Sequence, residues 1–343
     1  MKRSAKIDNM RILLMFLVVL AHLYTQLPYK KMPSVYVQRT LIFAFHMPAM
    51  AFISGICFHR SASNDRRVLH NFIYPYVVFQ MLWFLANNLV FDKEVVLTFT
   101  KPSWTLWYLP ALALWYFVGN AAGNLSFRWK LILVLASFAV AIVVGFDDSV
   151  GSYLTLSRAI VFLPFFLLGS LLHENFDRVL ELCRKPLVKI FALTLLAWFF
   201  LTYFLYLLKL DGFSAAWLYQ YAGYADGGGT WGCRIITMLA AACMCFFLLV
   251  WVPDVRVPFV TPLGMHTMPI YLLHTFVIRF MEKLDLFTKL QNHLVLTFVL
   301  AVVITAALGS KPVVLASKPL MRWPFSPKKH KAEKKEAITA ENS

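Results

Sequence analysis

The sequence predicts an all-α membrane protein, a bundle of about ten transmembrane helices with both termini in the cytoplasm. Of its 343 residues, 60% are apolar and 16% are aromatic, a composition that excludes an ordinary soluble domain. Apolar runs of roughly 20 residues recur along the chain, and each is long enough to cross a bilayer. Since no stretch is long and polar enough for a separate soluble domain, we expect one transmembrane domain over residues 1–325, in the plasma or inner membrane of the cell.

Ten apolar runs, separated by charged or glycine-rich segments, define the expected spans in order. They cover about residues 10–27, 37–58, 71–91, 104–119, 131–146, 153–169, 187–208, 231–252, 262–280 and 293–315. The first run follows three basic residues and resembles a signal peptide, but no small-residue cleavage site follows it, so we expect a retained helix. The basic segments 60–67, 128–130 and 173–189 belong inside the cell, and the Gly- and Tyr-rich loop 209–230 belongs outside.

The net charge of +16 raises the question of a nucleic-acid partner, and the placement of the basic residues argues against one. Most of the 33 Lys and Arg residues fall in segments that the alternating path puts in the cytoplasm, a bias typical of membrane proteins. Residues 326–343 form a Lys-rich tail that we expect to be disordered and cytoplasmic. The five cysteines include no Cys-x-x-Cys pair, so neither a disulfide framework nor a zinc site is expected.

Ionisable residues interrupt the first span on one helical face. Arg11 and His22 are eleven residues apart and Asp8 precedes Arg11 by three, so at about 100° per residue the three share one side of the helix. Arg11 as a positive-inside anchor and His22 as a packed histidine are alternatives. Ionisable groups in a bilayer are costly, however, and usually face a cavity or the bundle interior. Two of them on one stripe therefore favour a functional face.

Further motifs follow this stripe in a fixed order. They are His46-Met47-Pro48 with Ser54-Gly55, Pro75-Tyr76, Trp104-x2-Trp107-x-Leu109, Arg158 with Pro164-Phe165-Phe166-x2-Gly169, and Gly264 with Tyr271-x2-His274. Together with Asp8-x2-Arg11-x10-His22, these segments resemble the acyltransferase-3 family of membrane proteins over nearly the whole chain. The stretch from Arg158 to Gly169 is most similar to the branch named for fucose O-acetylation.

The resemblance implies an O-acyltransferase that moves an acyl group, usually acetyl, from acyl-CoA to a sugar hydroxyl of a surface glycan or lipid-linked precursor. Acetyl-CoA or another acyl-CoA would be the co-substrate, with no metal, and His22 stands where the family has its proposed catalytic histidine. This chain differs from the pattern of the family in two respects. Many members have a second Arg where this chain has His70, and some carry an extra hydrolase-like domain that we do not expect here. Transfer would then be completed by the membrane module or by a partner.

A depth count gives a geometry for this chemistry. At ~1.5 Å per residue, four polar residues lie ~7 to 14 Å below the outer surface and could converge on one site: His22, His46, Arg158 and His274. We assign catalysis to His22, Arg11, Asp8 and His46, and the acceptor site to Arg158, His274 and Trp107. Arginines at the cytoplasmic ends suit the phosphates of CoA, so we assign donor binding to Arg11, Arg60, Arg66 and Arg67.

Plainer roles stay open for several of these residues. His46 and His274 could be packed histidines bonded to backbone carbonyls, Arg158 an interface anchor, and Trp107 a member of the aromatic belt. The alternative functions are a glycolipid or polysaccharide transporter or flippase, without the repeated halves common in transporters, and an N-acyltransferase acting on an amino sugar. The expected partners are the carbohydrate acceptor, the acyl-CoA donor and the lipid bilayer, with no nucleic acid and no preference for an oligomeric state.

Overall fold

The computed structural model describes residues 4–61, 64–147, 150, 153–207, 223–225, 230–291 and 293–322. These residues form helices and short connections, and no strand occurs among them. The predicted all-α membrane bundle is confirmed. The predicted tail at 326–343 and most of the loop 209–230 lie outside the described residues.

Each of the ten expected spans coincides with a helix. The longer helices are α1 (Ala5–Gln26), α2 (Pro33–Ile56), α4 (Tyr74–Leu89), α5 (Tyr108–Ala122), α6 (Phe127–Val143), α7 (Leu156–His173), α9 (Pro186–Leu207), α10 (Trp231–Trp251), α12 (Thr267–Lys283) and α14 (Leu294–Leu308). The shorter ones are α3 (Asn64–Val68), α8 (Phe176–Arg184), α11 (Val260–Gly264), α13 (Leu286–Leu290) and α15 (Lys311–Met321). Single turns complete the path: η1 (Tyr29–Lys31), η2 (Leu69–Ile73), η3 (Trp104–Trp107), η4 (Val144–Phe146) and η6 (Tyr153–Thr155).

Not every helix is a straight crossing. Seven helical segments in the described ranges are long and apolar enough to span a membrane, or eight if the bent pair α14–α15 is one span. α5 and α12 have 15 and 17 residues, somewhat short of the ~20 that a straight crossing needs. The tenth expected span bends by 65° between α14 and α15. Ser310 is extended there and Pro312 stands in the first turn of α15, a position that suits Pro because its missing N–H is not needed.

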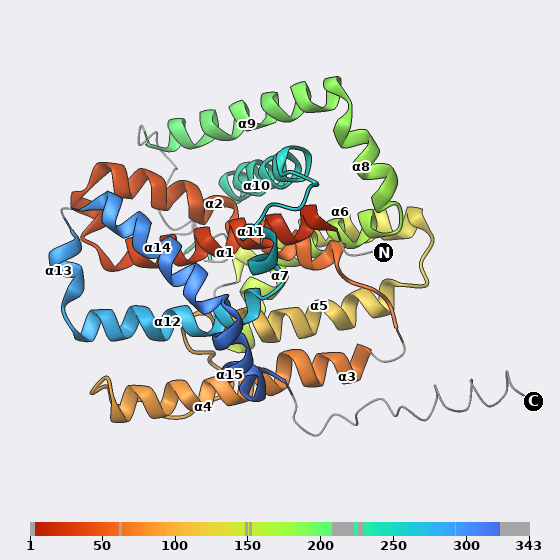
Figure 1. The fold of residues 1–343 in the computed structure, drawn as a ribbon. Helices are drawn as coiled ribbons and strands as arrows, with labels where there is room; N and C mark the ends of the chain where they lie inside the picture. Colours follow the sequence, from red (N-terminus) through yellow and green to blue (C-terminus); the bar gives the residue numbers. More distant parts are fainter. Residues whose placement is uncertain are drawn as a thin grey trace, which may run out of the picture.

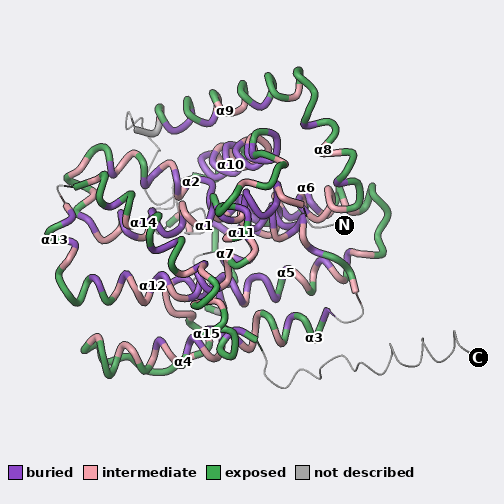
Figure 2. The backbone as a smooth tube through the Cα atoms, in the orientation of Figure 1, coloured by how far each residue is buried: buried purple, intermediate pink, exposed green. Residues whose placement is uncertain are grey.

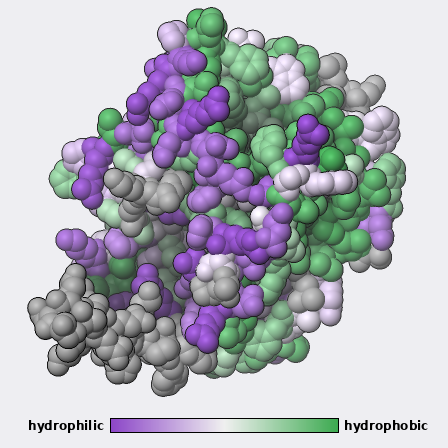
Figure 3. Space-filling model, turned by 90° about the vertical axis from the view of Figure 1, so that its right-hand side faces the viewer, coloured by the Kyte–Doolittle hydropathy of each residue, from purple (hydrophilic) through white to green (hydrophobic). Residues whose placement is uncertain are grey.

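The helices lie side by side with their ends gathered at two opposite faces (Figure 1). One face carries the N-terminus, α3, α8 and the α5–α6 connection, and we call it the basic end. The opposite face carries α13 and the α1–α2 connection, and we call it the far end. Figure 3 looks onto the basic end and shows hydrophilic side chains gathered over its left and central parts, with hydrophobic ones at the right. Exposed arginines of this end include Arg66, Arg67, Arg128, Arg178 and Arg184.

α1, α2, α7 and α10 are buried along most of their length, whereas α9 is exposed along one side (Figure 2). α2 and α7 approach each other closely, because each helix places a glycine against the other's backbone. A Cβ added to Gly55 would lie 1.9 Å from the Phe166 carbonyl oxygen, and one added to Gly169 would lie 2.0 Å from that of Phe52. Small residues let membrane helices approach this closely, and the contact holds α2 and α7 at a fixed separation.

Polar side chains at the start of α1 fix its rotation and depth. Lys6 Nζ donates to the Val252 carbonyl oxygen at 2.7 Å, at the carbonyl end of α10 where a cation is favoured. Asn9 Nδ2 donates to the carbonyl oxygens of Pro253 and Val255, each at 3.0 Å, and Thr261 Oγ1 donates to Asn9 Oδ1. With the first turns held in this way, the stripe of Arg11 and His22 faces the interior of the bundle.

Candidate active site

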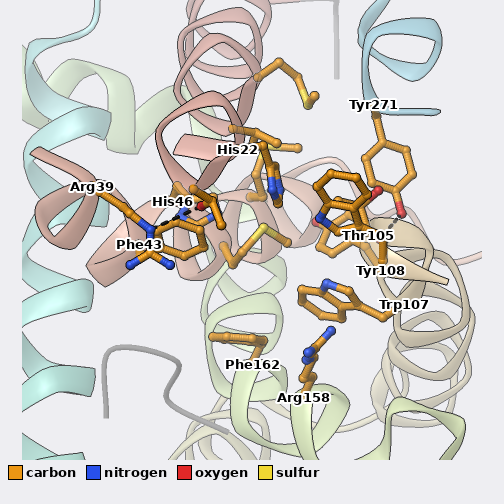
Figure 4. A pocket seen from close by; sticks show the side chains of 16 residues that line it. His22, Arg39, Phe43, His46, Thr105, Trp107, Tyr108, Arg158, Phe162 and Tyr271 are labelled. Carbon is orange, nitrogen blue, oxygen red and sulfur yellow. Dashed lines mark hydrogen bonds between the residues drawn. The ribbon is translucent and has the colours of Figure 1, made fainter. Parts of the chain in front are cut away.

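A cavity of about 230 Å³ lies between α1, α2, α7 and the turn η3 that leads into α5, nearer the far end. We call it the outer cavity. Its lining includes three of the predicted acceptor and catalytic groups together with His22 (Figure 4): His46, Trp107 and Arg158. Of the four residues in the depth count, His22, His46 and Arg158 line this cavity, and His274 does not.

His22 reaches the outer cavity from α1 and is half-buried. Its ring lies edge-on to two aromatic rings, with centroids 6.2 Å from Phe43 and 5.6 Å from Trp104. A third ring contact joins it to His274, at 5.4 Å between centroids. Within the described part of the chain, no group hydrogen-bonds the nitrogens of His22, so they are available to a ligand in the cavity.

His46 and His274 both make the backbone bond that the packing alternative expected. The Nδ1 of His46 lies 2.8 Å from the Ile42 carbonyl oxygen and that of His274 lies 2.9 Å from the Ile270 carbonyl oxygen. Since a carbonyl only accepts, Nδ1 carries the proton in each ring and Nε2 carries a lone pair. The two differ in position, because His46 lines the outer cavity while His274 lies fully buried behind His22.

Arg158 and Trp107 form one wall of the outer cavity. The guanidinium carbon of Arg158, in the first turn of α7, lies 5.1 Å from the centroid of the Trp107 ring, and Figure 4 shows the two side chains one above the other. Such a cation–π pair holds a planar donor group and a flat apolar face side by side. This combination suits a sugar, which presents both hydroxyl groups and an apolar ring face.

Arg39 also lines the outer cavity, although the sequence reasoning gave it no role. It is 5% exposed, its Nε donates to Thr25 Oγ1 at 3.1 Å, and its guanidinium lies 4.6 Å from the Phe43 ring centroid. A signal for it was present in the sequence. Arg39 is a charge inside an apolar run, two helical turns before His46 and on the same face.

A second cavity of about 270 Å³, which we call the inner cavity, lies nearer the basic end and contains Arg11. The Arg11 side chain is 33% exposed, and its Nη1 lies 3.7 Å from Oδ1 of the buried Asp8. Asp8 does not line the cavity. Its link to the cavity is the ion pair with Arg11. Thioether, hydroxyl and aliphatic side chains make up most of the remaining lining.

Four residues line both cavities and form the partition between them: Met15, Met50, Tyr108 and Tyr271. The two tyrosine rings lie 6.1 Å apart between centroids. The Tyr108 hydroxyl bonds to Ser54 Oγ at 2.9 Å, and the Tyr271 hydroxyl donates to the Thr105 carbonyl oxygen at 2.7 Å. Only a layer of side chains thus separates the spaces that Arg11 and His22 face.

The remaining predicted donor arginines are not brought to Arg11. Arg60 packs across Gly123, bonds to the Asn124 side chain and lines a different cavity of about 290 Å³ at the basic end. Arg66 and Arg67 are exposed on α3. The donor set is therefore spread over the surface of the basic end, with Arg11 alone reaching the inner cavity.

The outer cavity combines groups that can move a proton with groups that can stabilise negative charge. Imidazole exchanges protons near neutral pH, and a fixed guanidinium stabilises an oxyanion that forms during acyl transfer. Among the described residues, no cluster of three or more His, Cys, Asp or Glu could hold a metal ion. The side chains present are those of acid–base and electrostatic chemistry.

The sequence model of an acyltransferase domain, acyltransferase-3, matches residues 4–310. The chain belongs to the acyltransferase-3 family. The family predicted from the motifs is thereby confirmed, and the match includes every element that lines the two cavities. Among curated proteins and among solved structures, none matches this chain. Family and fold together identify a multi-pass membrane acyltransferase.

Proposed function

We propose that this acyltransferase moves an acyl group, acetyl in the simplest case, from acyl-CoA to a sugar hydroxyl of a surface glycan or a lipid-linked precursor. The observation that carries the proposal is the pair of cavities on one face of α1, with Arg11 in the inner cavity and His22 in the outer cavity. The resemblance of Arg158 to Gly169 to the fucose O-acetylation branch supports a carbohydrate acceptor.

The donor enters from the basic end, which faces the cytoplasm by the positive-inside bias. Acyl-CoA carries several phosphate charges and cannot cross lipid, so its nucleotide stays at this end, near Arg60, Arg66 and Arg67. Guanidinium groups bind phosphate in a fork geometry. The uncharged thioester arm extends past Arg11 through the largely apolar inner cavity to the partition at Tyr108 and Tyr271.

The acceptor enters the outer cavity from the opposite side of the membrane. Trp107 offers a flat face for the sugar ring, and Arg158 offers hydrogen bonds to its hydroxyl groups. His46 adds an Nε2 lone pair at the same cavity. In this arrangement one hydroxyl of the sugar lies between His22 and the thioester.

The chemistry is a single acyl transfer. His22 removes the proton from the sugar hydroxyl as its oxygen attacks the thioester carbonyl, and a guanidinium of the outer cavity, Arg158 or Arg39, stabilises the oxyanion. The carbon–sulfur bond then breaks, and the thiolate of CoA takes the proton from His22. The products are the O-acylated sugar and free CoA.

Labelling of membranes with [14C]acetyl-CoA tests this proposal. Membranes from cells that contain the protein should incorporate label into their glycan or glycolipid fraction, and membranes from otherwise identical cells without it should not. Alkaline hydroxylamine should release the label from an oxygen ester and leave an amide intact, which separates O-acylation from N-acylation. Equal labelling with and without the protein would refute the proposed function.

A further inference from the structure

The outer cavity leaves open which ring nitrogen of His22 carries the proton and which carries the lone pair. A neutral imidazole carries one proton, and a general base needs its lone pair on the nitrogen that faces the substrate. That choice is fixed in other enzymes by a hydrogen bond from the other ring nitrogen. Two of the rings around His22, Phe43 and Trp104, meet it edge-on. They pack against it but offer no acceptor atom.

His274 offers such an acceptor. Its Nδ1 proton is committed to the Ile270 carbonyl, one turn earlier in α12, so its Nε2 carries a lone pair. In the described structure this Nε2 is buried and has no hydrogen-bond partner. A buried acceptor without a partner is destabilising, so we looked for a group that the Nε2 of His274 could accept from.

The position of His274 indicates that this group is His22. His274 is 0% exposed and does not line the outer cavity, so the acceptor sugar does not reach it. Its ring centroid lies 5.4 Å from that of His22, with the ring planes at 45°, a separation at which the two imidazoles can be joined by one N–H···N bond after a small ring rotation. α1 and α12 pack against each other, which keeps the two rings adjacent.

We propose that His274 is a positioning residue for His22, and not part of the acceptor site. Its Nε2 accepts a hydrogen bond from one ring nitrogen of His22, so the lone pair of His22 points into the outer cavity. This inference rests on the proposed function, in which His22 is the base. When His22 takes the proton from the sugar hydroxyl, the same N–H···N bond stabilises the imidazolium, and the proton then passes to the departing thiolate.

Two substitutions separate the nitrogens of His274. An asparagine amide reaches about as far as Nδ1, so His274→Asn keeps a donor for the Ile270 carbonyl and removes the acceptor for His22. A glutamine amide reaches about as far as Nε2, so His274→Gln keeps an acceptor for His22 and gives up the Ile270 bond. A purely structural role for His274 favours the asparagine variant, and a positioning role favours the glutamine variant.

The test measures kcat and KM for [14C]acetyl-CoA with full-length variants in cell membranes, per amount of folded protein from gel filtration in detergent. We expect kcat of His274→Asn to fall by about 100-fold, as for loss of a partner that orients a catalytic group, with KM for acetyl-CoA within about twofold of wild type. His274→Gln should keep kcat within about tenfold of wild type. A wild-type kcat in His274→Asn, or equal losses in both variants, would overturn the inference.

His22→Ala, measured in the same membranes, distinguishes this inference from the proposed function. If His22→Ala is active, the role of His22 as base fails, and the role of His274 fails with it. If His22→Ala is inactive while His274→Asn turns over at the wild-type rate, the proposed function stands and the positioning role of His274 is wrong.

Discussion

The outer and inner cavities are similar in size, about 230 and 270 Å³, and share four lining residues, yet their chemistry differs. The outer cavity has two imidazoles and two guanidiniums, whereas the inner cavity has Arg11 as its one charged side chain. Both open onto the same face of α1. In the proposed function, depth along one helix thus separates two tasks: proton transfer belongs to the outer half, and fixing of the donor belongs to the inner half.

The largest effect on acyl transfer should come from a substitution in the outer cavity, where we propose that the proton moves. His22→Ala removes the base from the outer cavity and leaves the inner cavity intact. We expect transfer to fall by about 10³-fold, within the range for loss of general-base catalysis, while CoA binding and the amount of inserted protein stay near wild type. Glycan labelling measures the first and calorimetric titration with CoA the second. Turnover near the wild-type rate would show that the outer cavity is not where the proton moves.

The next effect should come from the inner cavity. Arg11→Lys keeps the positive charge beside Asp8 and loses the planar fork. We expect transfer to fall by about 100-fold, since misplacement of a bound group by about 1 Å can have an effect of this size. The kinetics of acetyl-CoA use measure it. Full activity of the lysine variant would mean that charge alone matters at this position.

A substitution in the partition should lower acyl transfer and raise hydrolysis of acetyl-CoA. Tyr271→Ala joins the two cavities, so water should reach the thioester. We expect transfer to fall by roughly tenfold, because the acyl group is less well oriented, and acetyl-CoA hydrolysis without an acceptor to rise. Free CoA released with and without glycan measures both. The matched control is Tyr271→Phe, which keeps the ring and loses the bond to the Thr105 carbonyl; it should not hydrolyse acetyl-CoA, and hydrolysis in that variant would place the barrier elsewhere.

The smallest effect belongs to the exposed arginines of α3. Replacement of Arg66 and Arg67 together by alanine should raise KM for acetyl-CoA by several-fold and leave KM for the acceptor unchanged, because solvent-exposed charges each contribute about 1 kcal/mol or less. The difference from wild type should shrink in high salt, which screens exposed charges. A larger change in acceptor affinity than in donor affinity would reverse the sides that we assign to the two substrates.

The sequence predicted the positions of the helices because long apolar runs in a membrane protein leave little choice of structure. It also predicted that His22, His46 and Arg158 meet, since depth along a helix follows from residue count alone. Three features were not predicted. The bend at Ser310 is a local feature, with Pro312 just after it, and it lies inside the expected span 293–315. The burial of Arg39 against Thr25 and the partition at Tyr108 and Tyr271 depend on which helices are neighbours, and spacing along one helix does not contain that information.

The same limit applies to the donor arginines. Arg11, Arg60, Arg66 and Arg67 all lie toward the basic end, as the charge pattern indicated, but only Arg11 faces the inner cavity. Their assignment to donor binding stays a prediction. For Asp8, the spacing of three from Arg11 predicted a shared helical face, and the structure places the two side chains 3.7 Å apart on that face.

A structure of the full-length protein with CoA bound, determined in a lipid environment, would test the two-cavity arrangement most directly. We predict the thiol at the partition beside Tyr108 and Tyr271. The phosphates should lie at the basic end among the arginines assigned to the donor: Arg11, Arg60, Arg66 and Arg67. The rings of His22 and His46 should border the outer cavity. A nucleotide bound in the outer cavity beside Arg158, or histidine side chains directed into lipid, would contradict this arrangement.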